Sequence, residues 1–385
     1  MYTKTNLKAV LMYKRKNKME MYRETAKRIV FVGIVFVTLV LFIIACICAY
    51  DISADTLNAS VDYLSSFDAI DVMANTSSEE NELTEESSEA EVSSGELSSE
   101  ISVDSSETEP DEGYMAGAVF EKLSGVYVNS PYCFVYNQTT NTILYEKNAY
   151  DKCYPASVTK LLTAAVALEY VPSDTIFTVG NEIDRVGHNS SMAYIDKGER
   201  YALKDLIYAL LLPSGNDVAF TIAVNTSRYI YGETLGEQEA IDAFMKLCND
   251  KLLEIRAYNT HFSCPDGYHS DDHYTTAYDM MLICLYSTSF DEITTACGTY
   301  EYYCKTADGV GKGWRNSNNM LNKHSQYYSS LVKGLKTGST TEAGKCLATL
   351  AEKDGEKLYI VVLGASNVDE RNNDTLEIIH SVLGY

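Results

Sequence analysis

The chain changes composition abruptly near residue 113, and this change limits its fold more than any other feature. Residues 51–112 carry 19 acidic residues and no Lys or Arg. Within them, the stretch from Thr76 to Gly113 consists mainly of Ser and Glu and has no aromatic residue. Such a segment cannot bury enough apolar surface to offset the entropy it would lose on ordering. We therefore predict a disordered acidic linker over 51–113 and one folded domain over 114–385.

An apolar segment precedes this linker. Ile29 to Tyr50 is 22 residues long and carries no charge, which is enough to cross a bilayer as a helix at about 1.5 Å per residue. Residues 1–28 hold nine basic and two acidic residues. The positive-inside rule then predicts a basic cytoplasmic tail (1–28), a single transmembrane helix (29–50) and a folded domain on the outer side of the cell membrane. Two alternatives stay open: a cleaved secretory signal, or lipidation of Cys46 in a lipoprotein-like Ile43–Cys46 box.

Charge and cysteine content narrow the partners. The net charge of −23 comes largely from the linker, and no basic stripe follows the N-terminal cluster, so no nucleic-acid partner is expected. As a coil the linker would reach roughly 45 Å from the membrane, and a domain tethered in this way is expected to be a monomer.

Eight cysteines lie beyond the apolar segment without any C-x-x-C pair, which leaves their pairing open. His261, His269 and His273 lie in a loop-like stretch, where a structural role is favoured over metal binding. Neither a metal nor a cofactor is predicted.

The periodicity of the folded part favours an α+β domain. It predicts strands over Pro131–Tyr136, Thr142–Glu146, Leu331–Thr337, Lys345–Glu352 and Lys357–Gly364, and helices after Ser157 and over Leu203–Leu212, Asp217–Tyr231, Glu237–Leu253, Thr275–Leu285 and Asp374–Leu383. Strands at both ends with helices between them indicate one antiparallel five-stranded sheet, flanked by helices, with an inserted helical subdomain.

Three short motifs within this domain carry chemistry. In Ser157-Val158-Thr159-Lys160, a spacing of three on a helix brings the Lys160 amine beside the Ser157 hydroxyl, and a serine becomes a nucleophile only beside such a base. At the start of a helix, the Ser157 N–H can also bind a developing oxyanion. A second S-x-x-K, Ser330 to Lys333, runs into a predicted strand, and we interpret it as accidental.

The other two motifs complete a reaction site. Ser214-Gly215-Asn216 lies on a turn 57 residues after Ser157, where Ser214 can relay a proton and the Asn216 amide can hold a peptide group. Lys336, 179 residues after Ser157, is followed by Thr337 and Gly338. Lys336 and the Thr337 hydroxyl can bind a carboxylate, Gly338 lets a substrate backbone approach, and the Ser339 N–H would complete an oxyanion hole. The set predicts an acyl-transferring serine enzyme.

These motifs and their surroundings resemble the low-molecular-mass penicillin-binding proteins that act as serine D-alanyl-D-alanine carboxypeptidases, with a β-lactamase/transpeptidase-like fold. The resemblance covers roughly Pro131 to Tyr385 and includes LYEKNAYDKCYPASVTKLLTA, LLPSGNDVA, THFSCPDGYH and VKGLKTGSTTEAGKC. It implies that Ser157 is acylated, that Lys160 accepts its proton and that Lys336 binds the terminal carboxylate of a peptidoglycan stem peptide ending in D-Ala-D-Ala. It further implies that β-lactams acylate Ser157 as substrate mimics, and that the enzyme acts in cell-wall metabolism and cell shape.

Two departures from the family pattern matter. Many relatives continue into a C-terminal β-rich domain with an amphipathic membrane helix, whereas this chain stops about 47 residues after Lys336-Thr337-Gly338, so the N-terminal span and tether are expected to replace that anchor. The turn before the nucleophile, Gln138 to Asn141, lacks the glycine that relatives often have.

Two other functions stay open at this point. A β-lactamase of the same fold would need a glutamate in an E-x-x-x-N segment to activate the deacylating water, and we find no such segment between Asn216 and Lys336. A membrane-anchored sensor of β-lactam or peptidoglycan would acylate without useful turnover. The retention of every motif residue favours the enzyme.

Overall fold

The computed structural model describes residues 113–384. The predicted cytoplasmic tail, transmembrane helix and nearly all of the predicted linker lie outside this range, as does Cys46. Among the described helices, none combines the length and the apolar character that a membrane crossing needs.

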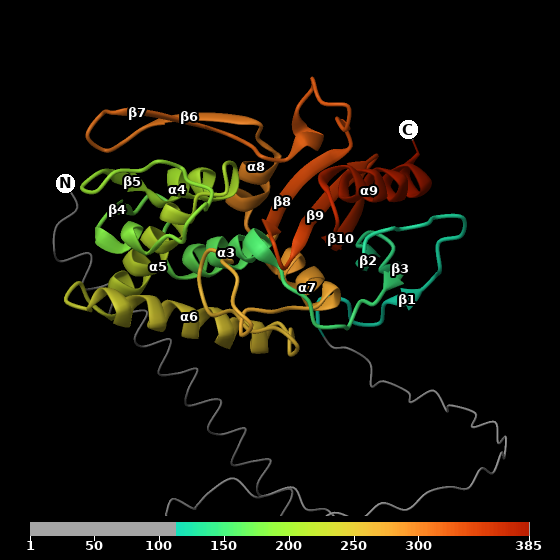
Figure 1. Cartoon of the computed structure of the whole chain (residues 1–385), viewed down its shortest axis with the longest axis horizontal. Helices are drawn as coiled ribbons and strands as arrows, with labels where there is room; N and C mark the ends of the chain where they lie inside the picture. The colour runs from blue at the N-terminus through green and yellow to red at the C-terminus, as the bar shows by residue number, and fades with distance from the viewer. Residues whose placement is uncertain (1–112, 385) are drawn as a thin grey trace, which may run out of the picture. The chain divides into compact units, whose positions relative to one another are not determined.

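One mixed sheet and the helices on its two faces organise the domain (Figure 1). The strands are β1 (Val119–Phe120), β2 (Tyr132–Asn137), β3 (Thr142–Lys147), β4 (Ile176–Thr178), β5 (Arg200–Ala202), β6 (Glu301–Lys305), β7 (Gly311–Arg315), β8 (Val332–Thr340), β9 (Gly344–Lys353) and β10 (Glu356–Ala365). The helices are α3 (Lys160–Tyr170), α4 (Leu203–Leu211), α5 (Asn216–Tyr231), α6 (Glu237–Glu254), α7 (Ala277–Ser287), α8 (Asp291–Gly298) and α9 (Val368–Leu383), with short 3-10 helices at Ala156–Thr159, Asn181–Arg185 and Asn319–Leu321.

The main sheet has the strand order β1-β3-β2-β10-β9-β8. Strand β2 pairs antiparallel with β10, so the N- and C-terminal segments of the domain share one sheet, as the sequence predicts. The predicted count of five strands is wrong, because β1 adds a sixth that pairs parallel to β3. β1 has only two residues, both exposed, and so it lacks the alternating apolar pattern that would reveal it in the sequence. The other end of the sheet, β8, is an edge strand.

Successive side chains of the central strands point to opposite faces of the sheet, and this gives the domain two hydrophobic cores. On β10, Tyr359, Val361 and Leu363 face the larger core, which contains residues of α3 to α8. Leu358 and Ile360 face the smaller core, which α9 closes. Figure 1 shows α9 on one side of the sheet and α7 on the other, with α3 to α6 gathered beyond the β8 edge. The catalytic motifs lie where these helices meet that edge.

Most predicted elements are confirmed within one to three residues at each end. The Asp354-Gly355 turn between β9 and β10 has both residues at positive φ, which is the conformation of a tight two-residue hairpin. Helix α9, however, begins at Val368 rather than at Asp374, because the Asn367 side chain caps it by accepting a hydrogen bond from the Glu370 N–H. The residues of its first turn are polar, so the sequence of this turn looks like that of a loop.

Candidate active site

The nucleophile motif forms a 3-10 turn that leads into a helix. Ser157 lies within Ala156–Thr159, and the α-helix begins only at Lys160. Lys160 is fully buried, and its Nζ lies 2.9 Å from Ser157 Oγ, 2.8 Å from Asn216 Oδ1 and 2.5 Å from the backbone oxygen of Asp266. The predicted Ser–Lys contact is therefore present in the folded domain.

Burial changes the acidity of this lysine. Removal from water lowers the pKa of Lys160 to about 8, and the negative charge of Asp266 opposes part of that change. With a pKa of about 8, about a tenth of the amine is neutral at pH 7, compared with less than about 0.1% for an ordinary lysine. A neutral amine at 2.9 Å can accept the proton of the Ser157 hydroxyl.

A chain of hydrogen bonds from His273 holds the turn before the nucleophile. The buried His273 ring accepts a hydrogen bond from the Ser263 N–H at Nδ1, so Nε2 carries the proton and donates it to Thr159 Oγ1 at 2.8 Å. Thr159 Oγ1 in turn donates to the Ala156 carbonyl, also at 2.8 Å. Ala156 has a φ of 48°, a left-handed conformation that costs a non-glycine residue about 1 kcal/mol. Burial lowers the pKa of His273 to about 3, so this ring is neutral at physiological pH.

The same loop approaches the turn closely at Gly267. A Cβ atom at Gly267 would lie 2.1 Å from the Ala156 oxygen, and Gly267 has a φ of 80°. The loop from Phe262 to Tyr268 thus fixes both members of the catalytic pair: it contacts the Ser157 turn through Gly267 and Lys160 through Asp266. A structural role was predicted for the histidines of this stretch, but the contacts of Asp266 and Gly267 with the catalytic pair are not evident from the sequence.

The second motif lies on a turn, as predicted, but glycine is not what makes the bend. Ser214 itself has the positive φ, 64°, while Gly215 has an ordinary φ of −60°. Gly215 is required for space, because a Cβ there would lie 2.8 Å from the Ala209 oxygen. Ser214 Oγ is buried and has no hydrogen-bond partner among the described residues.

The third motif supplies a buried amine. Lys336 on β8 is 1% exposed, and its Nζ donates to the Thr337 carbonyl at 2.9 Å. Burial, together with the neighbouring charges of Lys160 and Arg371, lowers the pKa of Lys336 well below its usual value. No ion pair joins Lys336 to a carboxylate within residues 113–384. The Thr337 hydroxyl shares a hydrogen bond with Ser317 Oγ at 2.8 Å, a partner that the sequence analysis missed.

Gly338 joins the sheet to the nucleophile. A Cβ at Gly338 would lie 2.8 Å from the Pro155 oxygen and 3.1 Å from the Ser157 nitrogen. Glycine is therefore needed here for the packing of β8 against the nucleophile turn, in addition to the predicted approach of a substrate. The next residue, Ser339, accepts a hydrogen bond from Lys345 Nζ at 2.7 Å through its hydroxyl.

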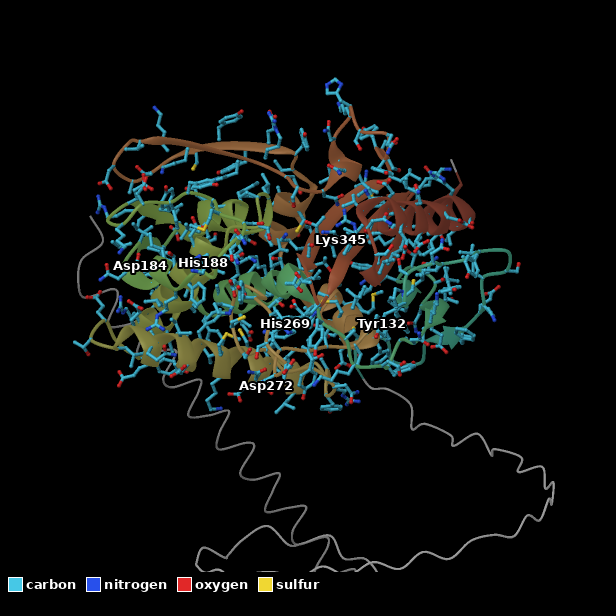
Figure 2. All side chains as sticks on the ribbon, viewed as in Figure 1. Tyr132, Asp184, His188, His269, Asp272 and Lys345 are labelled. Carbon is cyan, nitrogen blue, oxygen red and sulfur yellow. The ribbon has the colours of Figure 1, made fainter. Side chains whose placement is uncertain are left out.

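A cavity of about 360 Å³ opens over Ser157. Its lining comes from the loop His188–Ser191, the loop Gly267–His269, Asn216, and the end of β8 with the turn after it, from Ser339 to Glu342. Figure 2 marks His188 and His269, which belong to two different loops that line this cavity. No cluster of three or more His, Cys, Asp or Glu suited to a metal ion occurs in the described domain.

The second S-x-x-K has none of these features. Ser330 and Lys333 are exposed, and Lys333 Nζ donates to the Ser330 carbonyl rather than to its hydroxyl. Val332, between them, already belongs to β8, as the sequence predicts. Of these two serines, only Ser157 lies beside a buried amine and opens to a cavity, and only its turn is held in place by a second loop.

The fold and the pairing of Ser157 with a buried lysine are the features expected of an active-serine acyltransferase. The comparisons with known proteins agree, since residues 123–367 match the family described as D-alanyl-D-alanine carboxypeptidase. The chain therefore belongs to the D-alanyl-D-alanine carboxypeptidase family, which confirms the resemblance drawn from the motifs.

Individual relatives place the chain within this family. It is 32% identical over 244 residues to D-alanyl-D-alanine carboxypeptidase DacF of Bacillus subtilis, covering 62% of this chain and 58% of that protein. The D-alanyl-D-alanine carboxypeptidase of Streptomyces sp. K15 is 28% identical, with 64% of this chain and 84% of that one covered. The crystal structure of the Streptomyces K15 DD-transpeptidase superposes with a TM-score of 0.61 at 27% identity, over 67% of this chain and 98% of that one. The chain thus spans less than two thirds of the Bacillus subtilis relative.

Proposed function

We propose that this protein is a serine D-alanyl-D-alanine carboxypeptidase that removes the terminal D-alanine from peptidoglycan stem pentapeptides. The observation that carries the proposal is the 2.9 Å contact between Ser157 Oγ and a fully buried lysine whose pKa is lowered to about 8. Family membership supplies the substrate class, and the cavity over Ser157, which the end of β8 also lines, supplies a place for the peptide end.

In the first half of the reaction, Ser157 Oγ attacks the carbonyl carbon of the penultimate D-alanine while its proton moves to Lys160. The Ser157 and Ser339 N–H groups stabilise the oxyanion that forms. The peptide C–N bond then breaks, and the leaving amine of the terminal D-alanine receives a proton through the Ser214 hydroxyl. Lys336 and Thr337 bind the carboxylate of that D-alanine, and the Asn216 amide holds the stem backbone.

In the second half, a water molecule attacks the ester carbon and gives its proton to Lys160. The second tetrahedral intermediate collapses, Ser157 Oγ regains a proton and the shortened peptide leaves. β-Lactams would enter the first half in the same way, since opening their ring leaves an ester on Ser157, and they would act as inhibitors.

We further propose the location of the enzyme. The apolar run 29–50, with basic residues before it and acidic residues after it, supports a single-pass anchor in a bacterial cell membrane. The acidic segment would then hold a monomeric catalytic domain on the outer side of the membrane, among cell-wall peptides. Fractionation of cells, with protease accessibility of the domain in intact spheroplasts, tests this placement.

The test of the activity compares two serines. The full-length protein, Ser157→Ala and the matched control Ser330→Ala are incubated with a pentapeptide ending in D-Ala-D-Ala, and released D-alanine is measured. We expect release by the parent and by Ser330→Ala, and none by Ser157→Ala. If no variant releases D-alanine although the parent is stably labelled by a fluorescent penicillin, the result favours a sensor of β-lactam or peptidoglycan over a carboxypeptidase. Rapid turnover of penicillin would instead indicate a β-lactamase.

A further inference from the structure

The β6–β7 hairpin is bonded to the segment that follows one of the cavity loops. Figure 1 shows this hairpin extending over α4 and β5. Along β7, exposed residues alternate with Lys312 and Trp314. Lys312 Nζ donates to the Tyr194 carbonyl at 3.1 Å, and Trp314 Nε1 donates to the Ala193 carbonyl at 2.9 Å. One face of β7 thus holds backbone that lies 118 to 121 residues earlier in the chain.

Trp314 is the only tryptophan of the chain, and its side chain is 6% exposed. Its ring centroid lies 6.3 Å from that of the fully buried Tyr201. An indole N–H that is removed from water needs an acceptor, and the Ala193 carbonyl supplies it. Trp314 belongs to none of the three catalytic motifs, and the reaction proposed above gives it no role.

The start of α5 holds the same segment from the other side. Asp217 is fully buried, and its carboxylate accepts hydrogen bonds from the Ala193 N–H at 3.0 Å and the Ile195 N–H at 3.2 Å. The Asn216 N–H donates to the carbonyl of Ser191, which lines the cavity, at 2.9 Å. The cavity loop is therefore bonded to α5 directly at Asn216, and to β7 through Ala193.

Close packing couples this segment to the catalytic pair. A Cβ atom at Gly215 would lie 2.8 Å from the Ala193 Cβ atom, so little space separates the two backbones. Asn216 Oδ1 accepts a hydrogen bond from Lys160 Nζ at 2.8 Å. The Asn216 Nδ2 group is then the part of that amide that can donate to a substrate carbonyl. A shift of Ala193 would consequently move the group that is proposed to hold the substrate.

We propose that Trp314 is a positioning residue for acylation, which fixes the cavity loop and the Asn216 amide through its hydrogen bond to the Ala193 carbonyl. Trp314 does not line the cavity, so it acts through Asn216 and not on the substrate. This inference rests on the proposed function, in which Asn216 holds a backbone amide of the substrate. Its effect should therefore be larger for compounds that present an amide to Asn216.

The single tryptophan allows a replacement of one atom group. When the full-length protein is produced in a tryptophan-auxotrophic host, a tryptophan analogue enters only at position 314. In benzothienylalanine, sulfur replaces the ring N–H while the size and shape of the ring are kept. Fluorotryptophan retains the N–H and is the matched control. Thermal unfolding of both proteins checks that they are folded, and Trp314→Phe, which also lacks the N–H, provides a second test.

Two β-lactams report on the contact with Asn216. Benzylpenicillin carries a side-chain amide, and aminopenicillanic acid has the same ring system with a free amine in its place. Their acylation rates are measured by competition with a fluorescent penicillin for Ser157. Loss of the N–H should slow acylation by benzylpenicillin about 3- to 10-fold, the range expected for one hydrogen bond, and acylation by aminopenicillanic acid by less than about twofold. The fluorotryptophan protein should match the parent with both compounds.

A double variant tests whether Trp314 acts through Asn216. In Asn216→Ala the preference for benzylpenicillin should already be reduced, and loss of the Trp314 N–H should not reduce it further, because the two changes affect one contact. A further reduction in this background would show that Trp314 does not act through Asn216. Equal slowing of both β-lactams, or parental rates in the benzothienylalanine protein, would also overturn the positioning role.

The outcomes separate this inference from the proposed function. If the parent is acylated by both β-lactams but releases no D-alanine from a pentapeptide ending in D-Ala-D-Ala, the carboxypeptidase is overturned, and the ratio of the two acylation rates still decides the role of Trp314. If neither β-lactam acylates the parent, both proposals fail together, since no acylation remains for Trp314 to support.

Discussion

The nucleophile motif and the β8 motif each contain a buried lysine, and the surroundings of the two lysines differ. Lys160, at the start of α3, has three oxygen atoms within 2.9 Å of its Nζ, from Ser157, Asn216 and Asp266. Lys336, on β8, donates to a single backbone oxygen, that of Thr337. Burial lowers the pKa of both lysines.

The difference shows how one residue type serves two tasks. An ammonium can donate three hydrogen bonds, so the three acceptors around Lys160 leave no donor for a ligand, and its remaining capacity is to exchange a proton with Ser157. Lys336 keeps two N–H groups for an anion, and a substrate carboxylate would offset the cost of its burial. The hydrogen-bond partners of a buried lysine thus indicate whether it acts as a base or binds an anion.

Replacement of the proton-handling lysine should have the largest effect. Lys160→Met keeps most of the side-chain volume and removes the base, and we expect acylation by a fluorescent penicillin to slow by about 10³-fold. Lys333→Met, in the second S-x-x-K, should label at the parental rate. Labelling reactions quenched at a series of times measure both rates. Thermal unfolding of each variant checks that it is folded. If Lys160→Met stays within tenfold of the parent, Lys160 is not the base.

Replacement of the anion-binding lysine should have a smaller effect that depends on the substrate. Lys336→Met removes a charge-assisted contact worth about 1.5–3 kcal/mol, so kcat/KM for a peptide with a free C-terminal carboxylate should fall about 10- to 100-fold. The same peptide with a C-terminal amide should show almost no additional loss. Equal losses on the two peptides would mean that Lys336 supports the structure of the site rather than the carboxylate.

The pH dependence should follow the proton-handling lysine. Because the neutral form of Lys160 is the active base, acylation should rise about tenfold per pH unit below about 8 and level off above it. A rate profile from pH 6 to 9 measures this. Lys336→Met, assayed with the amidated peptide, should keep the midpoint near 8. A midpoint that moves in this variant would assign the titration to Lys336 instead.

The sequence predicted the parts of this comparison that depend on short spacing. Ser157 and Lys160 lie three residues apart, and both strands of the β9–β10 hairpin were predicted to within one residue at each end. The sequence could not reveal the contacts made by Asp266, His273 and Ser317, because each of these residues lies 20 or more positions from its partner. The polar first turn of α9 and the two-residue β1 were missed for a different reason, since neither has an apolar period.

The smallest expected effect concerns the hydrogen bonds that hold the nucleophile turn. Ala156 keeps its left-handed backbone while Thr159 Oγ1 bonds its carbonyl and His273 bonds Thr159. Thr159→Val removes the hydroxyl and leaves the buried His273 N–H without an acceptor, which should cost about 1–3 kcal/mol of stability. A displaced turn should also slow acylation about 3- to 10-fold, since small errors in the position of a nucleophile reduce its rate.

Two companion variants separate positioning from general destabilisation. Thr159→Ser keeps the hydroxyl and should restore acylation to near the parental rate even if the lost methyl group lowers the unfolding temperature. His273→Phe removes the donor, and in combination with Thr159→Val it should cost less than the sum of the two single variants, because the unsatisfied N–H disappears with the ring. Parental acylation by Thr159→Val would show that the packing of Gly267 and Gly338 against the turn positions Ser157 without this hydrogen-bond chain.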